Sequence, residues 1–213
     1  MKLYTYFRSS AAWRVRIALG LKGLAWTAEF IHLVRDGGEQ LRPEYRARNP
    51  TALVPTLETD AGALLAQSLA MIEYLDETHP EPPLLPRDML ARARVRAFAL
   101  TVACEIHPLN NLRVLRYLGS VMGQDQAARE AWYAHWIAEG LAALEAMLAT
   151  EPGPFCFGIA PGLADICLVP QLGNARRMRC PVEPYPRLLA AEAAALGLPA
   201  FRDAAPDRQP DAT

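Results

Sequence analysis

Hydrophobic and polar positions change their period along the chain at a proline-rich segment, residues 80–86. Before this segment, residues 11–22 and 68–79 carry apolar positions at helical spacing, and residues 39–49 predict a short helix or turn. Four short apolar segments predict strands, at residues 2–6, 25–33, 54–59 and 63–67. The order is a βαβ unit followed by a ββα unit. We expect the first two strands to be parallel because a helix connects them.

Beyond the proline-rich segment, the apolar positions recur at helical spacing. The segment itself, PEPPLLP, has four prolines in seven residues, which is typical of a linker. Helices are predicted at residues 88–119, 125–149, 162–178 and about 184–195, before a proline-rich tail. These patterns predict a small α/β domain over residues 1–80 and an all-helical domain over residues 88–213.

Composition and charge argue against several kinds of protein. The 213 residues are 52% hydrophobic, enough for a sizeable core, and the net charge of −1 argues against a nucleic-acid partner. The four cysteines and four histidines show no spacing typical of a metal site. The first residues lack the apolar region of a signal peptide, and no apolar run is long enough to span a bilayer. We expect a cytoplasmic protein with no metal and no membrane partner.

Serines stand where two of the predicted helices begin. Ser9 and Ser10 precede the first helix, and Ser68 begins the helix after the hairpin. Serine is a preferred N-cap, so capping alone explains each of them. A helix N-terminus also carries partial positive charge and unpaired N–H groups, which stabilise an anion such as a thiolate. A hydroxyl that donates to the sulfur would lower the thiol pKa further, so both interpretations stay open.

Two other motifs have backbone interpretations. Pro55 removes a hydrogen-bond donor from a predicted strand, and a cis Val54–Pro55 bond would accommodate it. The backbone N–H and C=O of Val54 would then face outward, toward a peptide-like ligand. Asp165 follows Gly162 by three residues, the spacing of a helix capping box, and we interpret it as structural.

Arginines are the candidates for binding an acidic substrate. Of the 22 basic residues, 20 are arginine, whose planar guanidinium binds carboxylates in a fork. Arg8 directly precedes the serine pair, and Arg113, Arg176 and Arg177 lie on predicted helices. Each of them could instead lie on a solvated helix face. His107 has two interpretations in the same way, as a core histidine or as a ligand contact.

The run SSAAWRVRIALGLKG resembles the signature of the zeta class of cytosolic glutathione transferases. Further segments resemble the same class in the same order: NPTALVPTL, QSLAMIEYLDE, CEIHPLNNLRVLRYL, ADICLVPQ and RQPD. The resemblance covers essentially the whole chain. It implies the glutathione transferase fold, with a thioredoxin-like N-terminal domain and an all-helical C-terminal domain. It also implies glutathione as cofactor and a homodimer.

The resemblance assigns roles to individual residues. It implies that Ser9 is catalytic, which leaves Ser10 to cap the helix, and that Ala11 stands where the class usually has a cysteine. Gln67 and Ser68 would hold the γ-glutamyl end of glutathione. The full set implied to contact glutathione is Ser9, Ser10, Ala11, Gln40, Val54, Pro55, Gln67, Ser68, His107 and Asn111. The set implied to bind substrate is Arg8, Arg113, Arg176 and Arg177.

The zeta class contains maleylacetoacetate isomerases and maleylpyruvate isomerases, both glutathione-dependent. We expect a cis–trans isomerase of a small dicarboxylate, with maleylacetoacetate first because it is the commoner assignment. Maleylpyruvate follows closely because Arg113 matches the maleylpyruvate enzymes, whereas the maleylacetoacetate enzymes often have serine there. The alternatives are a transferase acting on small electrophiles such as α-halo acids, and a non-catalytic glutathione-binding protein. The presence of Ser9, Gln67 and Ser68 argues against the last alternative.

Overall fold

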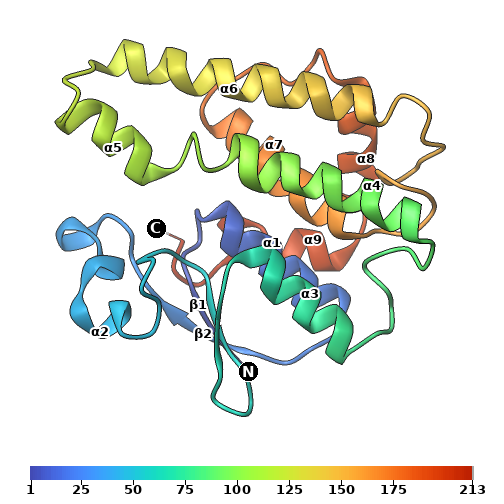
Figure 1. The fold of residues 1–213 in the computed structure, drawn as a ribbon, viewed down its shortest axis with the longest axis horizontal. Helices are drawn as coiled ribbons and strands as arrows, with labels where there is room; N and C mark the ends of the chain where they lie inside the picture. Colours follow the sequence, from blue (N-terminus) through green and yellow to red (C-terminus); the bar gives the residue numbers. More distant parts are fainter. Residues whose placement is uncertain (213) are drawn as a thin grey trace. The chain divides into compact units, whose positions relative to one another are not determined.

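The computed structural model describes residues 1–212, and the chain divides into two compact units (Figure 1). The first unit comprises Met1–Pro83 together with the last residues of the chain, from Leu196 onward. The second unit is Leu84–Ala195. The mixed sheet lies in the first unit and the second is helical, so the predicted fold class is confirmed.

The first unit is built on a four-stranded sheet with the order β2-β1-β3-β4. The strands β1 (Lys2–Thr5) and β2 (Thr27–Phe30) pair in parallel, as predicted, and α1 (Ser10–Leu21) connects them. The strands β3 (Thr56–Glu58) and β4 (Leu64–Ala66) form an antiparallel hairpin that leads into α3 (Ser68–Thr78). Two 3₁₀ turns and α2 (Pro43–Arg46) connect β2 to β3.

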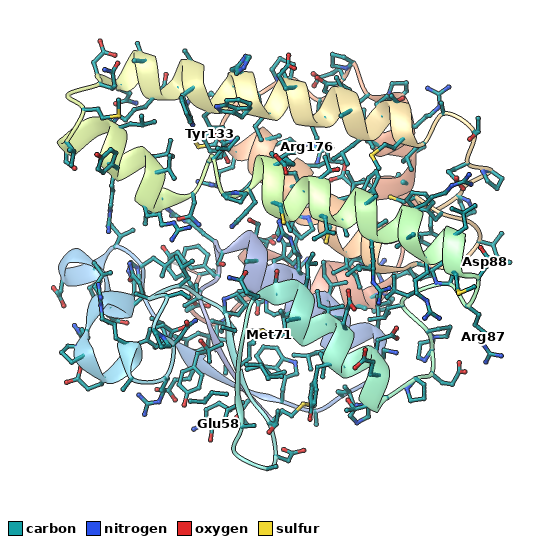
Figure 2. All side chains as sticks on the ribbon, viewed as in Figure 1. Glu58, Met71, Arg87, Asp88, Tyr133 and Arg176 are labelled. Carbon is teal, nitrogen blue, oxygen red and sulfur yellow. The ribbon has the colours of Figure 1, made fainter. Side chains whose placement is uncertain are left out.

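The two faces of this sheet carry different side chains, because successive residues of a strand point to opposite faces. Leu3 of β1 lies opposite Leu57 of β3 and both are fully buried, as are Met71 (labelled in Figure 2) and Leu75 of α3. The residue next to Leu3 belongs to the other face. There a second group of buried residues, which we call the Tyr4 cluster, comprises Tyr4, Tyr6, Phe7, Tyr45 and Val54.

The end of the chain belongs to the first unit. The helix α9 (Pro199–Asp203) contacts α1, and a Cβ atom on Gly20 of α1 would lie 3.1 Å from the Cβ of Ala200. The sequence predicts residues 196–213 as part of the helical domain, and of these the structure describes residues 196–212. The close approach at Gly20 and a hydrogen bond from Arg16 to the Ala204 carbonyl explain why this segment packs on α1 instead.

The second unit consists of α4 (Met89–Leu100), α5 (Leu112–Ser120), α6 (Gln126–Met147), α7 (Leu163–Arg177) and most of α8 (Pro186–Leu196). Helix α7 is its centre, since nearly every residue from Leu163 to Leu172 is buried and α7 contacts α4. No helix in the described residues is both long enough and apolar enough to cross a bilayer.

The prediction of a single helix over residues 88–119 is wrong, because the α-helix is interrupted between α4 and α5. A π-helical segment, Thr101–Ile106, follows α4, and the next residues contain Pro108, which has no N–H to donate. Asn111 then has an extended backbone, and its side chain accepts a hydrogen bond from the Arg113 amide. Asn111 therefore caps a new helix, and helical spacing of apolar residues on both sides conceals the break.

Asp165 caps the start of α7, as its spacing from Gly162 predicts, and it forms one half of a capping box because glycine has no side chain to form the other. One oxygen of Asp165 accepts from the Gly162 amide at 2.9 Å, and the other accepts from the Cys156 amide at 2.8 Å. Burial raises the pKa of the Asp165 carboxyl, and the two amide donors oppose that rise. One buried side chain thus satisfies two backbone donors that would otherwise be unpaired.

We expect Asp165→Ala to destabilise the protein by about 3 kcal/mol, because it leaves a buried amide, that of Cys156, and a partly buried amide, that of Gly162, without an acceptor. Asp125 is a matched control, since its exposed carboxylate caps α6 with one hydrogen bond, from the Ala128 amide. Asp125→Ala should cost only about 1 kcal/mol. Urea unfolding of both variants measures the difference, and equal losses would contradict this account of the capping box.

Candidate functional site

Ser9 is the N-cap of α1. Its hydroxyl oxygen accepts a hydrogen bond from the Ala12 amide at 3.2 Å, and its carbonyl accepts from the Trp13 amide at 2.8 Å. Ser10 is the first residue of the helix and is buried, so the expectation that Ser10 caps α1 is wrong. A hydroxyl that accepts in this way keeps its own hydrogen for donation to a second group. The half-buried Ser9 therefore has a donor at the positive end of α1.

The residues before Ser9 form a tight turn. The Ser9 amide donates to the Tyr6 carbonyl at 3.0 Å, and Tyr6 and Phe7 are buried in the Tyr4 cluster. Arg8 lies in this turn and is exposed, with its guanidinium carbon 4.9 Å from the Phe7 ring centroid. The turn thus holds Ser9 against the core and leaves the charge of Arg8 in solvent.

The Val54–Pro55 bond is cis, which confirms the expectation for this segment. Val54 belongs to the Tyr4 cluster together with Tyr6 and Phe7. The structure therefore brings the Val54–Pro55 segment close to the turn that precedes Ser9. These two parts of the predicted site are far apart in the sequence but share one buried group of side chains.

A buried polar network that the sequence did not reveal holds the segment around Pro55. The Tyr45 hydroxyl donates to the Leu53 carbonyl at 2.7 Å and lies 2.9 Å from the Thr56 hydroxyl. The Asn49 amide donates to the same two oxygens. Burial raises the pKa of Tyr45, so it stays a neutral donor. Asn49 stands in the motif NPTALVPTL, the one signal that could have marked this network.

Gln67 and Ser68 lie at the start of α3. Gln67 has a φ of 69°, in the left-handed region that non-glycine residues rarely adopt, and its side chain is exposed. Ser68 is buried, and its hydroxyl accepts from the Arg14 guanidinium at 3.4 Å. Backbone strain of this kind is often found at functional sites. It therefore supports the assignment of these two residues to a binding site.

Gln40 has a buried oxygen with no hydrogen-bond partner in the described part of the chain. The side chain is 6% exposed, and its nitrogen makes a long 3.5 Å hydrogen bond to the Leu33 carbonyl. Gly38 makes room for it, because a Cβ there would lie 2.6 Å from the Gln40 amide. A buried acceptor left unpaired costs about 1–3 kcal/mol, so a ligand N–H at this position would recover that free energy.

The predicted residues of the second unit lie in two places. His107 and Asn111 are partly buried between α4 and α5, and Arg113 is exposed in the first turn of α5. Arg176 and Arg177 end α7, and their side chains differ in their contacts. Arg176, labelled in Figure 2, donates through two nitrogens to the buried carboxylate of Glu192, at 2.6 Å for one of them.

Arg177 is held less firmly than Arg176. Its guanidinium is exposed and donates to the Asn174 amide oxygen at 2.9 Å. Burial raises the pKa of the nearby Tyr133 to about 12, and the positive charge of Arg177 acts in the opposite direction. Arg177 therefore presents a cation that a carboxylate ligand could bind, whereas the charge of Arg176 is already matched by Glu192.

Two family models match the chain. Residues 3–83 match the glutathione S-transferase N-terminal domain, and residues 126–193 match the glutathione S-transferase C-terminal domain. A maleylacetoacetate isomerase of Pseudomonas aeruginosa is 48% identical over 211 residues, which cover 99% of this chain and 98% of that protein. The chain belongs to the glutathione S-transferase family.

Solved structures place this glutathione S-transferase in the zeta class. The holo structure of a maleylpyruvate isomerase, described as a zeta-class bacterial glutathione S-transferase, has a TM-score of 0.96 and 47% identity, with full coverage of both chains. A maleylacetoacetate isomerase from Methylobacterium extorquens AM1, with malonate and glutathione bound, has a TM-score of 0.95 and 39% identity, again with full coverage. The expected resemblance is confirmed.

We expect Ser9→Ala to lower the free energy of unfolding by about 1 kcal/mol, because Ser9 caps α1. Glycine is a better N-cap than alanine, so Ser9→Gly should lower the free energy of unfolding by only about 0.3 kcal/mol. Both variants lack the hydroxyl, so a difference between their free energies of unfolding in urea measures the effect of the cap alone. Equal stability of Ser9→Ala and the unaltered protein would show that another residue caps the helix.

Proposed function

We propose that this zeta-class chain is a glutathione-dependent cis–trans isomerase that converts maleylacetoacetate to fumarylacetoacetate. The observation that carries the proposal is the position of Ser9, a hydroxyl donor at the N-terminus of α1 in the turn held by the Tyr4 cluster. Relatives that match the whole chain are named maleylacetoacetate isomerase, which supports the choice of substrate.

The residues of the first unit fit glutathione. The N-termini of α1 and α3 favour negative charge, and the unpaired oxygen of Gln40 can accept from a peptide N–H. Glutathione is an acidic peptide, so it offers carboxylates and N–H groups to such a site. We assign it to Ser9, Ser10, Ala11, Gln40, Val54, Pro55, Gln67 and Ser68, and also to His107 and Asn111 of the second unit.

Ser9 activates the thiol of glutathione in this proposal. Bound glutathione would supply a thiolate, whose addition turns the maleyl double bond into a single bond that can rotate and whose departure restores the double bond. Donation from the Ser9 hydroxyl, together with the positive end of α1, stabilises that negative charge and lowers the thiol pKa from about 8.5 toward neutrality. The Ala12 amide holds the Ser9 hydroxyl oxygen, which leaves the hydroxyl hydrogen available to the sulfur.

Arginines bind the substrate carboxylates in this proposal. Arg113 and Arg177 are exposed, and neither is paired with a carboxylate in the contacts described above. We place Arg176 second to them, because Glu192 already neutralises its charge. Arg8, in the turn before Ser9, is the corresponding candidate in the first unit. The malonate held by the related Methylobacterium extorquens enzyme supports a dicarboxylate ligand.

Maleylpyruvate is the second candidate substrate. Arg113 lies exposed at the start of α5, where Asn111 fixes the helix, so it is a candidate partner for the second carboxylate of maleylpyruvate. The maleylpyruvate isomerase structure with a TM-score of 0.96 is consistent with this choice. Both substrates use Ser9 in the same way, and only the arginines distinguish them.

The function is tested with the two Ser9 variants. Ser9→Ala and Ser9→Gly should both lose about ten- to a thousandfold in kcat for isomerisation, because neither can donate to the sulfur. Their unfolding free energies differ, so a shared loss of activity cannot come from the cap. An unaltered protein that binds glutathione but converts neither maleyl acid would refute the proposed function.

We expect Arg113→Ala and Arg177→Ala each to lower kcat/KM for a maleyl diacid. The loss should correspond to about 2–4 kcal/mol of transition-state binding free energy. Conjugation of glutathione to a neutral nitroaryl halide should be almost unchanged, because that reaction needs only the thiolate. A loss at Arg113 restricted to maleylpyruvate would reverse the order of the two substrates. Equal losses with all three compounds would show that the arginines serve the fold instead.

We also propose that the protein is a homodimer located in the cytoplasm. The support is the resemblance to the zeta class, whose members pair two-fold. A stable homodimer buries a large, partly apolar surface, so it should persist at micromolar concentration. Light scattering should report about twice the 23.4 kDa of one chain. A mass near that of one chain would contradict the dimer.

A further inference from the structure

Arg16 of α1 is buried, 3% exposed, and its guanidinium holds the backbone that leads to Ser9. One terminal nitrogen donates to the Thr5 hydroxyl at 3.1 Å and to the Tyr6 carbonyl at 3.5 Å, and the other donates to the Phe7 carbonyl at 3.1 Å. Burial lowers the pKa of Arg16 to about 10, so it stays charged at neutral pH. A buried cation therefore points at the carbonyls of the Tyr6–Ser9 turn.

The end of the chain holds the same turn from its other side. One oxygen of Asp211 accepts from the Phe7 amide at 2.9 Å, and Ala212 packs against the Tyr4 cluster. The nearby charge of Asp211 also raises the pKa of Arg16, against the larger effect of burial. The Arg16 side chain is connected to the same C-terminal segment, since its third nitrogen donates to the Ala204 carbonyl at 3.0 Å.

The Phe7 residue thus lies between two opposite charges. Its carbonyl accepts from Arg16 and its amide donates to Asp211. The Tyr6 carbonyl, which also accepts from Arg16, receives the Ser9 amide and closes the turn. The orientation of Ser9 is therefore set on one side by α1 and on the other by a turn that Arg16 and Asp211 hold.

We propose that Arg16 and Asp211 are positioning residues for Ser9, so that the C-terminal segment takes part in activating the thiol. The inference rests on the proposed role of Ser9 and adds the residues that aim its hydroxyl. Small errors in the placement of a catalytic group reduce rates by up to about a hundredfold. A loosened Phe7 peptide would allow the Ser9 hydroxyl to turn away from the sulfur.

Asp211→Ala is the informative variant, because it removes the acceptor of the Phe7 amide at the very end of the chain. We expect the pH at which bound glutathione becomes a thiolate, followed by ultraviolet absorbance, to rise by about one unit, and kcat near neutral pH to fall about tenfold. In the protein without glutathione, amide exchange of the segment Tyr6–Ser9 should become faster. Asp211→Asn keeps an acceptor oxygen and should recover most of each loss.

Asp207→Ala is the matched control, since Asp207 is an exposed residue of the same segment. It should change none of these measurements. Arg16→Lys keeps the charge but not the planar set of donors, so a folded Arg16→Lys protein should give the same results as Asp211→Ala. If Arg16→Lys does not fold, Asp211→Ala alone tests the proposal. Urea unfolding of every variant shows whether a loss of kcat or a shift of the titration is explained by lower stability alone.

A double-mutant cycle decides whether Asp211 acts through Ser9. In a Ser9→Ala background, Asp211→Ala should leave the thiolate titration unchanged, because the hydroxyl is already missing. The same shift in both backgrounds would overturn the proposal, as would a normal titration in Asp211→Ala. The titration needs only glutathione, so an unaltered protein that titrates normally but isomerises nothing would refute the proposed function and leave this inference standing.

Discussion

The hydrogen bond from the Ala12 amide to the Ser9 hydroxyl oxygen determines what the first unit can do. It makes Ser9 the N-cap of α1, and so decides which residue lies at the positive end of the helix. It also uses the oxygen as an acceptor, which leaves the hydroxyl hydrogen as a donor. Capping and thiol activation, which the sequence presents as alternative explanations of the two serines, are therefore compatible at the same residue: Ser9 is the cap, and we propose that it also activates the thiol. Ser10, one position later, is buried within the helix.

Helix α1 connects Ser9 to the rest of the first unit through three buried cations. Arg14 donates to Ser68 at the start of α3, and Arg16 reaches the turn before Ser9 and the C-terminal segment. Lys22 ends the helix and donates to Asp76 and to the His79 and Pro82 carbonyls, each at 2.6 Å. Buried charges are stable only when they are well hydrogen-bonded, so each one requires its partner segment in a defined place. The helix thereby fixes the relative positions of the segments assigned to glutathione.

The order of strands and helices was predictable because it depends on local periodicity, and the cis bond at Pro55 followed from its family motif. Three features were not predictable from the periodicity of apolar residues. The cap at Ser9 depends on which serine oxygen reaches the Ala12 amide. The packing of the last residues on α1 depends on a close approach at Gly20. The break before Asn111 is hidden by helical spacing on both sides.

Some unfavourable features of the first unit lie at residues assigned to glutathione, and one lies at Asp211. Gln67 has a left-handed backbone, Gln40 has a buried oxygen without a partner in the described residues, and one oxygen of Asp211 is in the same condition. An arrangement selected for stability alone would favour glycine at the position of Gln67 and an apolar side chain at that of Gln40. Retaining polar groups there is costly to the free protein but preserves hydrogen-bonding capacity where a peptide ligand would bind. Asp211 also retains a polar group at a cost. Its carboxylate accepts from the Phe7 amide and its charge raises the pKa of Arg16, so it acts on the turn before Ser9 as well as on the C-terminal segment.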